Sequence, residues 1–354
     1  MEWLDFKSQS LAVNAGVFGV CTVLVWLSGW RIAKYADRFA SAAGLGHAMV
    51  GMVLLAGLTS LPEMAVTLSA ALSDSPKLAA NNLLGSIAMQ IAILAVADAM
   101  IGRRALTVVA GNSLVLLQTT MNVLLLVMVA LAIAVGDRAF MGAGLWSWAL
   151  AFAYLMAMWT VAHAGGQAQW VARRTQRQLD RAARGEDDGP APPPSGDEPV
   201  RPLVVRLAIA GAVILVAGFL LSQTGEAIAE QTGLGNSFVG AVFVAVATSL
   251  PETSSVVSSM RRRRYEMALS DIFGTNLYNI LLLFLVDLLY GGGPALNEVG
   301  TFALVGSLLG ALMAAIFLVG LLERRDKTVA RMGVDSLLVL IVYAGGLVAL
   351  YQLR

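Results

Sequence analysis

Long apolar stretches separated by short polar segments dominate the chain. A helix that crosses a bilayer needs about 20 mostly apolar residues, and ten stretches meet that requirement. They lie near residues 13–32, 46–72, 78–101, 106–135, 142–163, 203–222, 234–259, 267–290, 299–322 and 333–352. The pattern predicts an all-α integral membrane protein with ten transmembrane helices, and it allows a turn at Gly111–Ser113 inside the fourth stretch.

Composition agrees with this interpretation. Of the 354 residues, 58% are hydrophobic and 13% are charged, and the mean hydropathy is +0.74. A soluble protein this apolar could not cover its own surface, which argues against a nucleic-acid binder, a disordered regulator or a cytosolic enzyme. One cysteine and two histidines exclude a disulfide framework and a zinc site with several imidazoles. No nucleophile–base pair or phosphate-binding loop stands in a credible context, so we expect no enzyme and no cofactor.

The positions of the basic residues predict the orientation in the membrane. If the N-terminus is outside, 20 of the 24 lysines and arginines fall in inner loops, as the positive-inside rule requires. Both termini are therefore expected outside, in a cell membrane. The hydrophilic segment 165–201 is then cytoplasmic, and its basic first part and proline-rich acidic second part are typical of a linker.

An internal repeat relates the two sides of this linker. Thr59–Glu63 aligns with Thr248–Glu252 without a mismatch, and the same register aligns 45–91 with 234–280 without a gap. Two residues that this register aligns are called equivalent below. The predicted organisation is a first five-helix repeat at 1–164, the linker at 165–201 and a second five-helix repeat at 202–354. Because five is odd, the second copy enters the membrane from the opposite face, so we expect two inverted repeats with a substrate site between them.

Two glutamates, Glu63 and Glu252, are the acidic residues of the repeated motif and lie well inside their spans. An ionised side chain at that depth costs several kcal/mol unless it is paired or hydrated. No lysine or arginine lies deep in any span, so the partner must be a proton or a soluble cation. Oxygen ligands favour calcium, sodium or magnesium over soft metals.

Pro62 and Pro251 precede these glutamates and cannot donate hydrogen bonds to the carbonyls of Leu58 and Ala247. We therefore expect each helix to break at the midplane and to expose oxygen ligands there. The neighbouring polar residues form two groups. The first consists of the hydroxyl residues of the motifs, Thr59, Ser60, Thr248 and Ser249. The second consists of one polar stripe in each following helix, which are Asn82, Ser86 and Gln90 in the first half and Asp271, Thr275 and Asn279 in the second. Each stripe has the spacing i, i+4, i+8, so it lies on one helix face.

Structural alternatives apply to several of these residues. A Ser/Thr-Pro pair can be a packing kink, although its duplication with a buried glutamate argues against that reading. The stripes could hydrogen-bond between helices, and Gln118, Thr119, Thr120 and Asn122 are interpreted as packing residues. Asp98 and Asp287, which are also equivalent in the repeat, are expected at the membrane interface. Asp98 has Arg103 and Arg104 as candidate partners.

The two motifs resemble a known family. Leu-Thr-Ser-Leu-Pro-Glu at 58–63 and Ala-Thr-Ser-Leu-Pro-Glu at 247–252 are similar to the repeat cores of sodium/calcium exchangers, in the calcium/cation antiporter superfamily. Gly-Ser-Ile at 85–87 and Gly-Thr-Asn at 274–276 resemble the Gly-Ser-Asn element of that family. The resemblance implies a central group of ion sites, with the first and sixth spans sliding to alternate access.

By position, the resemblance makes Glu63 and Glu252 shared calcium and sodium ligands. It implies further oxygen ligands at Thr59, Thr248, Ser60, Ser249, Ser86 and Thr275, and backbone carbonyl ligands at Ala56 and Ala245. There are departures, because Gln90 and Asn279 occupy positions where the family has Asn or Asp, and Ile87 and Leu58 replace an asparagine and a glycine.

The predicted function is antiport of Ca²⁺, or a similar hard divalent cation, against Na⁺. The alternative is H⁺-coupled divalent antiport, and a passive cation channel or a membrane scaffold is the alternative of another class. The expected partners are inorganic cations and the lipid bilayer, with no nucleic acid.

Overall fold

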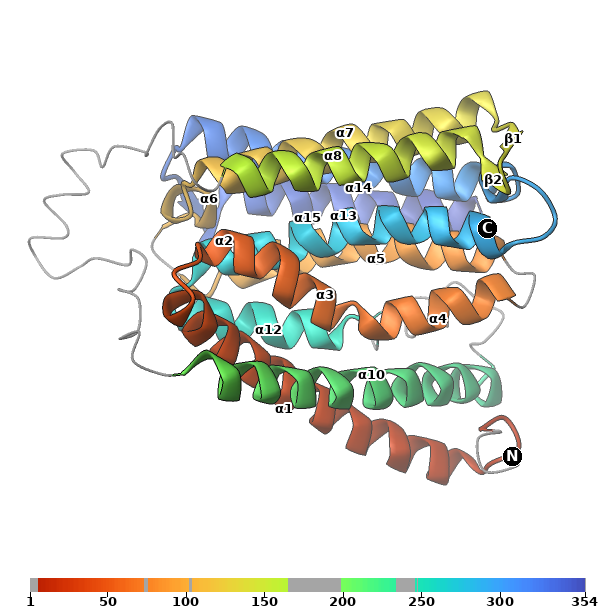
Figure 1. Ribbon diagram of the computed structural model, residues 1–354, viewed down its shortest axis with the longest axis horizontal. Helices are drawn as coiled ribbons and strands as arrows, with labels where there is room; N and C mark the ends of the chain where they lie inside the picture. The colour runs from red at the N-terminus through yellow and green to blue at the C-terminus, as the bar shows by residue number, and fades with distance from the viewer. Residues whose placement is uncertain are drawn as a thin grey trace, which may run out of the picture.

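The computed structural model describes residues 6–72, 76–101, 104–164, 199–233, 246 and 248–353, most of them in helices (Figure 1). The helices, in chain order, are α1 Leu11–Ala42, α2 His47–Val50, the π-helix η2 Gly51–Leu55, α3 Ala56–Thr59, α4 Leu61–Leu72, α5 Pro76–Asp98, α6 Leu106–Val109, α7 Ser113–Val135, α8 Leu145–Ala164, α10 Val200–Gln231, α12 Leu250–Arg261, α13 Tyr265–Leu289, the 3-10 helix η3 Ala295–Asn297, α14 Gly300–Glu323 and α15 Val334–Gln352. Two antiparallel hairpins pair β1 Ala139–Phe140 with β2 Ala143–Gly144, and β3 Thr328–Val329 with β4 Met332–Gly333.

Eight of the described helices are long and apolar enough to cross a membrane, and nine spans result if a bent pair of helical segments is counted as one. That pair, His47–Thr59 and Leu61–Leu72, is bent by 47°. The predicted seventh span, 234–259, lies partly outside the described residues, as does nearly all of the predicted linker 165–201. The predicted all-helical membrane architecture is therefore confirmed, and the count of ten spans stays a prediction.

The predicted turn inside the fourth stretch is confirmed. Helix α6 ends at Val109, and α7 begins at Ser113 after Asn112, whose side chain accepts a hydrogen bond from the N–H of Leu114 at 3.0 Å. This is an asparagine N-cap, which satisfies one of the free N–H groups of a helix start. A helical break at this point separates the short helix α6 from the long helix α7.

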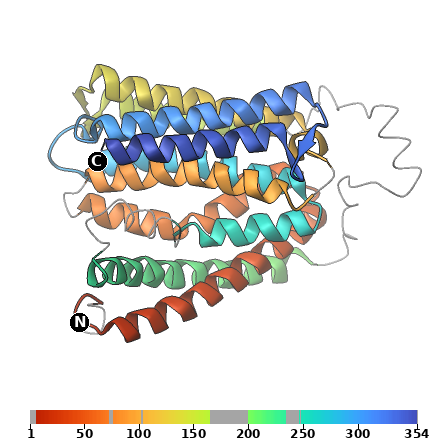
Figure 2. The same cartoon turned by 180° about the vertical axis from the view of Figure 1, so that it is seen from behind.

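Helix boundaries in the two halves of the chain follow the register of the sequence repeat. Helices α1 and α10, and likewise α4 and α12, begin and end at equivalent residues, and the paired strands of the two hairpins do the same. The remaining long helices, α5 with α13, α7 with α14 and α8 with α15, follow this register within two residues at each end. In Figures 1 and 2 the two hairpins lie at opposite ends of the bundle.

Helix α13 lies inside the bundle, next to α5, α7, α8 and α12 (Figure 1). Most of its residues are buried, and Phe273 packs edge-to-face against Phe317 of α14 with ring centroids 6.4 Å apart. Gly274 allows a close backbone approach, because a Cβ atom built there would lie 2.6 Å from the carbonyl oxygen of Met52 in η2. The π-helical segment therefore rests directly on the middle of α13.

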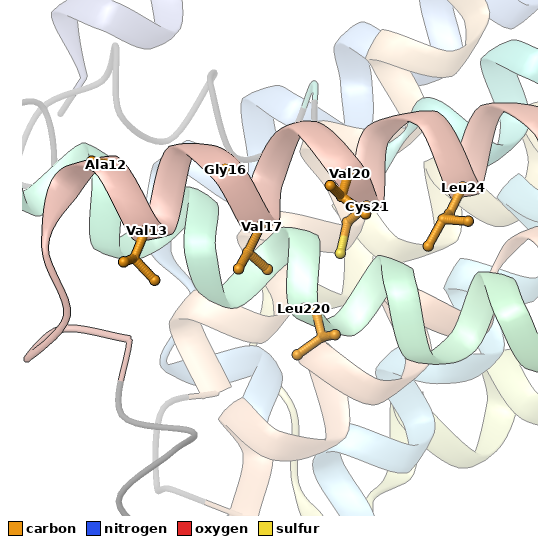
Figure 3. A pocket seen from close by; sticks show the side chains of 8 residues that line it. All are labelled: Ala12, Val13, Gly16, Val17, Val20, Cys21, Leu24 and Leu220. Atoms are coloured by element: carbon orange, nitrogen blue, oxygen red, sulfur yellow. The ribbon is translucent and has the colours of Figure 1, made fainter.

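Helices α1 and α10 pack against each other at one edge of the bundle (Figure 1). Between them is an apolar groove of about 490 Å³, whose lining includes Val17, Cys21, Leu24 and Leu220 (Figure 3). The lining carries no charged side chain and offers no oxygen ligand from a side chain. This surface is suited to contact with lipid and not with ions.

Ion pairs lie near both ends of this helix pair. Asp37 of α1 is 6% exposed, accepts a hydrogen bond from Nε of Arg264, and lies 2.9 Å from Nε2 of His47. Its equivalent in the second half, Glu226 of α10, is 51% exposed and lies 3.0 Å from Nζ of Lys7. Asp37 thus ties α1 to the core of the bundle, whereas Glu226 ties α10 only to the segment before α1.

Candidate cation-binding site

The first broken helix changes direction at Ser60. Helix α3 ends at Thr59, Ser60 has φ −80° and ψ 1°, and α4 starts at Leu61 with Pro62 as its second residue. Proline is well tolerated there, because the first N–H groups of a helix have no partner inside it. The predicted break beside Glu63 is therefore confirmed.

The second half has the same local geometry. Ser249 has φ −87° and ψ 8°, and α12 starts at Leu250 with Pro251 in its first turn. Glu252, like Glu63, lies in the first turn of its half-helix. Ala245, which the resemblance makes a backbone ligand, and Ala247, whose carbonyl was expected to be free, lie outside the described residues.

The two glutamates are fully buried and have no hydrogen-bond partner among the described residues. All four carboxylate oxygens of Glu63 and Glu252 are inaccessible and accept no hydrogen bond within the described part of the chain. Glu252 lies close to Glu63, to Asp271 and to the hydroxyl of Thr59. Native proteins pair nearly all buried polar atoms, because an unsatisfied buried group costs about 1–3 kcal/mol and a charged group costs more. A proton or a soluble cation is required to complete this arrangement.

Oxygen atoms gather at the end of α3. Thr59 Oγ1 donates to the carbonyl of Leu55 at 3.0 Å, and Ser60 Oγ donates to the carbonyl of Ala56 at 2.7 Å. Thr59 Oγ1 is also 3.5 Å from Oδ1 of Asp271, so it connects the first broken helix to α13. All five of these residues are buried.

The predicted stripes lie in α5 and α13 and are largely buried. Ser86 Oγ, Thr275 Oγ1 and both amide atoms of Gln90 and Asn279 make no hydrogen bond with any described residue. Asn82 is half-buried, and its Nδ2 also lacks a described partner. In the second broken helix, Thr248 is buried, and Ser249 Oγ is buried without a partner among the described residues. Hydrogen bonding between helices within the described chain therefore accounts for Asp271 of the second stripe, which bonds to Ser255 of α12, but not for Ser86, Gln90, Thr275 or Asn279.

Sequence reasoning missed two residues of this region. Ser255 is buried, and its single hydroxyl proton has two acceptors within reach, a carboxylate oxygen of Asp271 and the carbonyl of Glu252, the latter at 3.0 Å. Asn276 is buried, and neither end of its amide has a described partner. The available signal was the unusual polarity of the segment 253–259, TSSVVSS, inside a membrane helix.

The residues interpreted as packing groups behave in that way. Asn122 Nδ2 donates to the carbonyl of Phe273 at 2.8 Å, and Thr119 and Thr120 donate to carbonyls of their own helix at 2.7 and 2.8 Å. Gln118 Nε2 lies 3.5 Å from the carbonyl of Ala48. Asn122 and Gln118 thus contact α13 and α2, whereas Thr119 and Thr120 bond within α7.

Asp98 and Asp287 anchor backbone groups in matching ways. Asp98 accepts from the N–H of Leu106 at 2.7 Å and of Gly333 at 2.6 Å. Asp287 accepts from the N–H of Ala295 and, at 2.5 Å, from that of Gly144. Leu106 and Ala295 are equivalent in the repeat, and so are Gly144 and Gly333. Each aspartate therefore accepts one hydrogen bond from its own half and one from the hairpin glycine of the other half.

This finding corrects the candidate pairing of Asp98 with Arg104. Both of its carboxylate oxygens bind backbone N–H groups, and Arg104 instead lies 3.7 Å from Asp326; Arg103 lies outside the described residues. The carboxylate is used to join the end of α5 to the hairpin that precedes α15, so it is structural.

Acids, histidines and cysteines alone do not build a metal centre here. Among the described residues, no three side chains of these types converge on one point. A cation between Glu63 and Glu252 would therefore need hydroxyl, amide or carbonyl oxygens as its other ligands, and the site is rich in these groups. Such a ligand set suits calcium and sodium.

Comparison with known proteins agrees with this geometry. The family described as sodium/calcium exchanger protein matches residues 13–162 and 202–352. The chain is 26% identical over 261 residues to the inner membrane protein YrbG of Escherichia coli, covering 74% of this chain and 75% of YrbG. It is 26% identical over 274 residues to the putative antiporter CaxA of Alkalimonas amylolytica, covering 77% of this chain and 78% of CaxA.

A solved structure of the sodium-calcium exchanger NCX_Mj has the same fold. It aligns with a TM-score of 0.70 and 18% identity, over 98% of this chain and 100% of that one. The two proteins thus share the helical membrane architecture although their sequence identity is low. Because the family match covers most of both halves, the chain belongs to the sodium/calcium exchanger family and is a membrane transporter, not an enzyme.

Proposed function

We propose that the protein exchanges Ca²⁺, or a similar hard divalent cation, for Na⁺ at a site shared by Glu63 and Glu252. The observation that carries the proposal is the burial of four carboxylate oxygens without described hydrogen-bond partners. Two carboxylates balance one divalent ion or two monovalent ions, so binding of one kind of ion excludes the other. Competition for one site is the requirement for antiport.

The two halves are proposed to be inverted five-helix repeats within ten spans. The recurrence of helix bounds at equivalent residues and the hairpins at opposite ends of the bundle support this arrangement. The broken helices then supply ligands near the midplane, and α1 with α10 slides past them to alternate access. The excess of bases in one set of loops supports termini outside and a cytoplasmic linker.

The proposed oxygen ligands come from both halves. In addition to the glutamates they are Thr59, Ser60, Ala56, Asn82, Ser86, Gln90, Thr248, Ser249, Ala245, Asp271, Thr275 and Asn279. Burial of the described members of this set other than the half-buried Asn82, together with the unsatisfied oxygens of Ser86, Gln90, Ser249, Thr275 and Asn279, supports it.

Calcium-loaded proteoliposomes test the proposal and separate it from its alternatives. We expect external Na⁺ to accelerate Ca²⁺ efflux, and the double variant E63Q/E252Q to abolish that acceleration. Efflux driven by a proton gradient and indifferent to Na⁺ would instead establish H⁺-coupled antiport. Efflux that requires no counter-ion would establish a channel, and exchange unaffected by the double variant would rule out the two-glutamate site.

A further inference from the structure

The C-terminal part of α1 is fastened to the end of α12 and to the residues that follow it. Ser258 Oγ donates to the carbonyl of Trp30 at 3.1 Å, and Cζ of Arg261 lies 5.3 Å from the centroid of the Trp30 ring. Further along α1, the buried Asp37 accepts a hydrogen bond from Nε of the buried Arg264. These contacts all join the first half of the chain to the second.

Asp37 also joins α1 to the start of the first broken helix. Its Oδ1 lies 2.9 Å from Nε2 of His47, the first residue of α2. An imidazole can donate this hydrogen bond whether it is neutral or protonated. The end of α1, helix α2 and the end of α12 lie at the same end of the bundle in Figures 1 and 2. One buried carboxylate therefore connects three segments at this end.

The two helices α1 and α10 each cross the half-helix of the other repeat at a glycine. A Cβ atom at Gly29 of α1 would collide with Ser254 and with the carbonyl of Pro251 in α12. A Cβ atom at the equivalent Gly218 of α10 would collide with the ring of Pro62 in α4. The close approach is thus the same in both halves, and the difference between the helices arises beyond it.

Beyond the crossing, α10 lacks the partners that α1 has. Arg261–Arg264 are equivalent to Leu-Ser-Asp-Ser at 72–75, so the first half provides no basic residue at these positions. Glu226, the equivalent of Asp37, is exposed and pairs with Lys7, which precedes α1. The buried fastening between the two halves is therefore present at one end of the bundle and is not repeated at the equivalent positions.

Movement of α1 along α12 would separate the buried charges of Asp37 and Arg264. Separating a buried ion pair is costly, because each charge loses its partner in a region that water does not reach. The exposed pair of Glu226 and Lys7 can exchange its contact for water at little cost. The arrangement therefore opposes movement of α1 in this state and does not oppose movement of α10 in the same way.

We propose that Asp37, Arg264 and His47 form a latch that holds α1 in place and keeps this end of the bundle closed to ions. The contact of Arg261 with Trp30 belongs to the same fastening. The inference rests on the proposed exchange function, in which α1 and α10 slide to open one face at a time, and it deepens that function. The distribution of basic residues predicts that the latched end is cytoplasmic. The latch thus shifts the resting equilibrium toward the state that is closed on the cytoplasmic side.

The test compares the half-saturating Ca²⁺ concentration of Na⁺-driven exchange at the two faces, in right-side-out and everted membrane vesicles. The apparent affinity at a face depends on the fraction of the protein that is open to that face. The variant D37N/R264Q removes both charges and leaves no unpaired buried charge. We expect it to lower the half-saturating concentration at the cytoplasmic face, relative to the outer face, by at least about tenfold. E226Q is the matched control and should leave this ratio within about twofold of wild type.

Two exposed arginines provide a second matched pair if D37N/R264Q does not fold. Arg261 contacts Trp30 across the boundary between α12 and α1, whereas Cζ of Arg206 of α10 lies 5.8 Å from the ring centroid of Tyr35 of α1. The second contact lies within the pair of helices proposed to move together. We expect R261Q to shift the ratio in the same direction by about twofold to fivefold, and R206Q to leave it unchanged.

An unchanged ratio in D37N/R264Q, or equal ratios in R261Q and R206Q, would overturn the latch while leaving the exchange function intact. A loss of flux at both faces without a change of the ratio would likewise show that Asp37 only stabilises the fold. Failure of the exchange function itself would appear differently, as a wild-type protein in which Na⁺ drives no Ca²⁺ movement in either kind of vesicle.

Discussion

The half-helix α4 with α5 and the half-helix α12 with α13 share a backbone plan but differ in chemistry. Both half-helices begin after a serine of near-identical conformation and carry a proline and a glutamate in their first turn. The second pair adds a carboxylate and a serine at Asp271 and Ser255, where the first has Asn82 and Val66. The comparison teaches that two helix pairs can have the same backbone conformation at equivalent residues while the second pair carries more negative charge than the first.

The same contrast separates structural acids from those proposed to bind ions. Asp98 and Asp287 are also buried, but each accepts two backbone hydrogen bonds. Glu63 and Glu252 accept none from described residues. Burial alone therefore does not separate the two groups of acids, which differ in whether described residues donate hydrogen bonds to them.

The largest effect is expected from neutralising either glutamate, because both halves are required for one shared ion. E63Q and E252Q should each lower Na⁺-driven Ca²⁺ flux by at least about 100-fold while the protein stays folded. Removing a buried charge should leave the thermal midpoint equal or higher. Flux and melting in detergent are measured together, with the exposed E298Q as the control. Near-normal flux in one of the two variants would show that the halves do not share a site.

The equivalent acids of α1 and α10 should differ strongly in their contribution to stability. D37N removes the buried partner of Arg264 and should lower the free energy of unfolding by about 3–5 kcal/mol. E226Q disrupts an exposed pair with Lys7 and should cost less than about 1 kcal/mol. Denaturant unfolding in micelles measures both values. Similar losses in the two variants would contradict the view that Asp37, unlike Glu226, ties its helix to the core.

Asp98 and Asp287 should, in contrast, contribute equally. In D98N and D287N the new side-chain amide has only one acceptor oxygen, so one of the two backbone N–H groups faces an NH2 group and loses its hydrogen bond. Each variant should therefore lower the free energy of unfolding by about 1–3 kcal/mol. The same unfolding measurement applies, again with E298Q as the control. A difference of more than about 1 kcal/mol between the two variants would show that the two sets of backbone contacts are unequal in energy.

The smallest effect concerns the two hairpin turns. Gly142 has φ 83°, and its equivalent Arg331 has φ 68°, a left-handed conformation that favours glycine. R331G should stabilise the protein by up to about 1 kcal/mol, whereas G142A should destabilise it by a similar amount. The shift of the unfolding midpoint gives the sign. Destabilisation by R331G would mean that contacts of the arginine side chain outweigh the backbone effect.

Much of the fold could be predicted because the hydropathy of a segment and its helix-breaking residues determine the local structure directly. The spans, the bend before Pro62 and the turn at Gly111–Ser113 follow from short stretches of sequence. The length of α1 could not be predicted in this way, since it runs over Leu11–Ala42 and not 13–32. Hydropathy detects the part of a helix that lies in lipid, and Arg31, Lys34 and Arg38 continue the same helix beyond that part.

Much of the candidate site could also be anticipated, because the repeat identified the glutamates and the polar stripes. The partners of Asp98 could not, since its donors are backbone N–H groups, one of them 235 residues away. Every residue except proline has a backbone N–H group, so the residue type does not show which of these groups will donate to Asp98. Ser255 was missed for a related reason, as its importance depends on facing Asp271, and its neighbour Ser254 faces α1 instead.

Equilibrium binding of radioactive Ca²⁺ to the purified protein tests the central claim most directly. A site shared by Glu63 and Glu252 predicts saturable binding that Na⁺ displaces and that E63Q and E252Q each abolish. Retention of wild-type Ca²⁺ binding in either single variant would contradict a shared two-glutamate site.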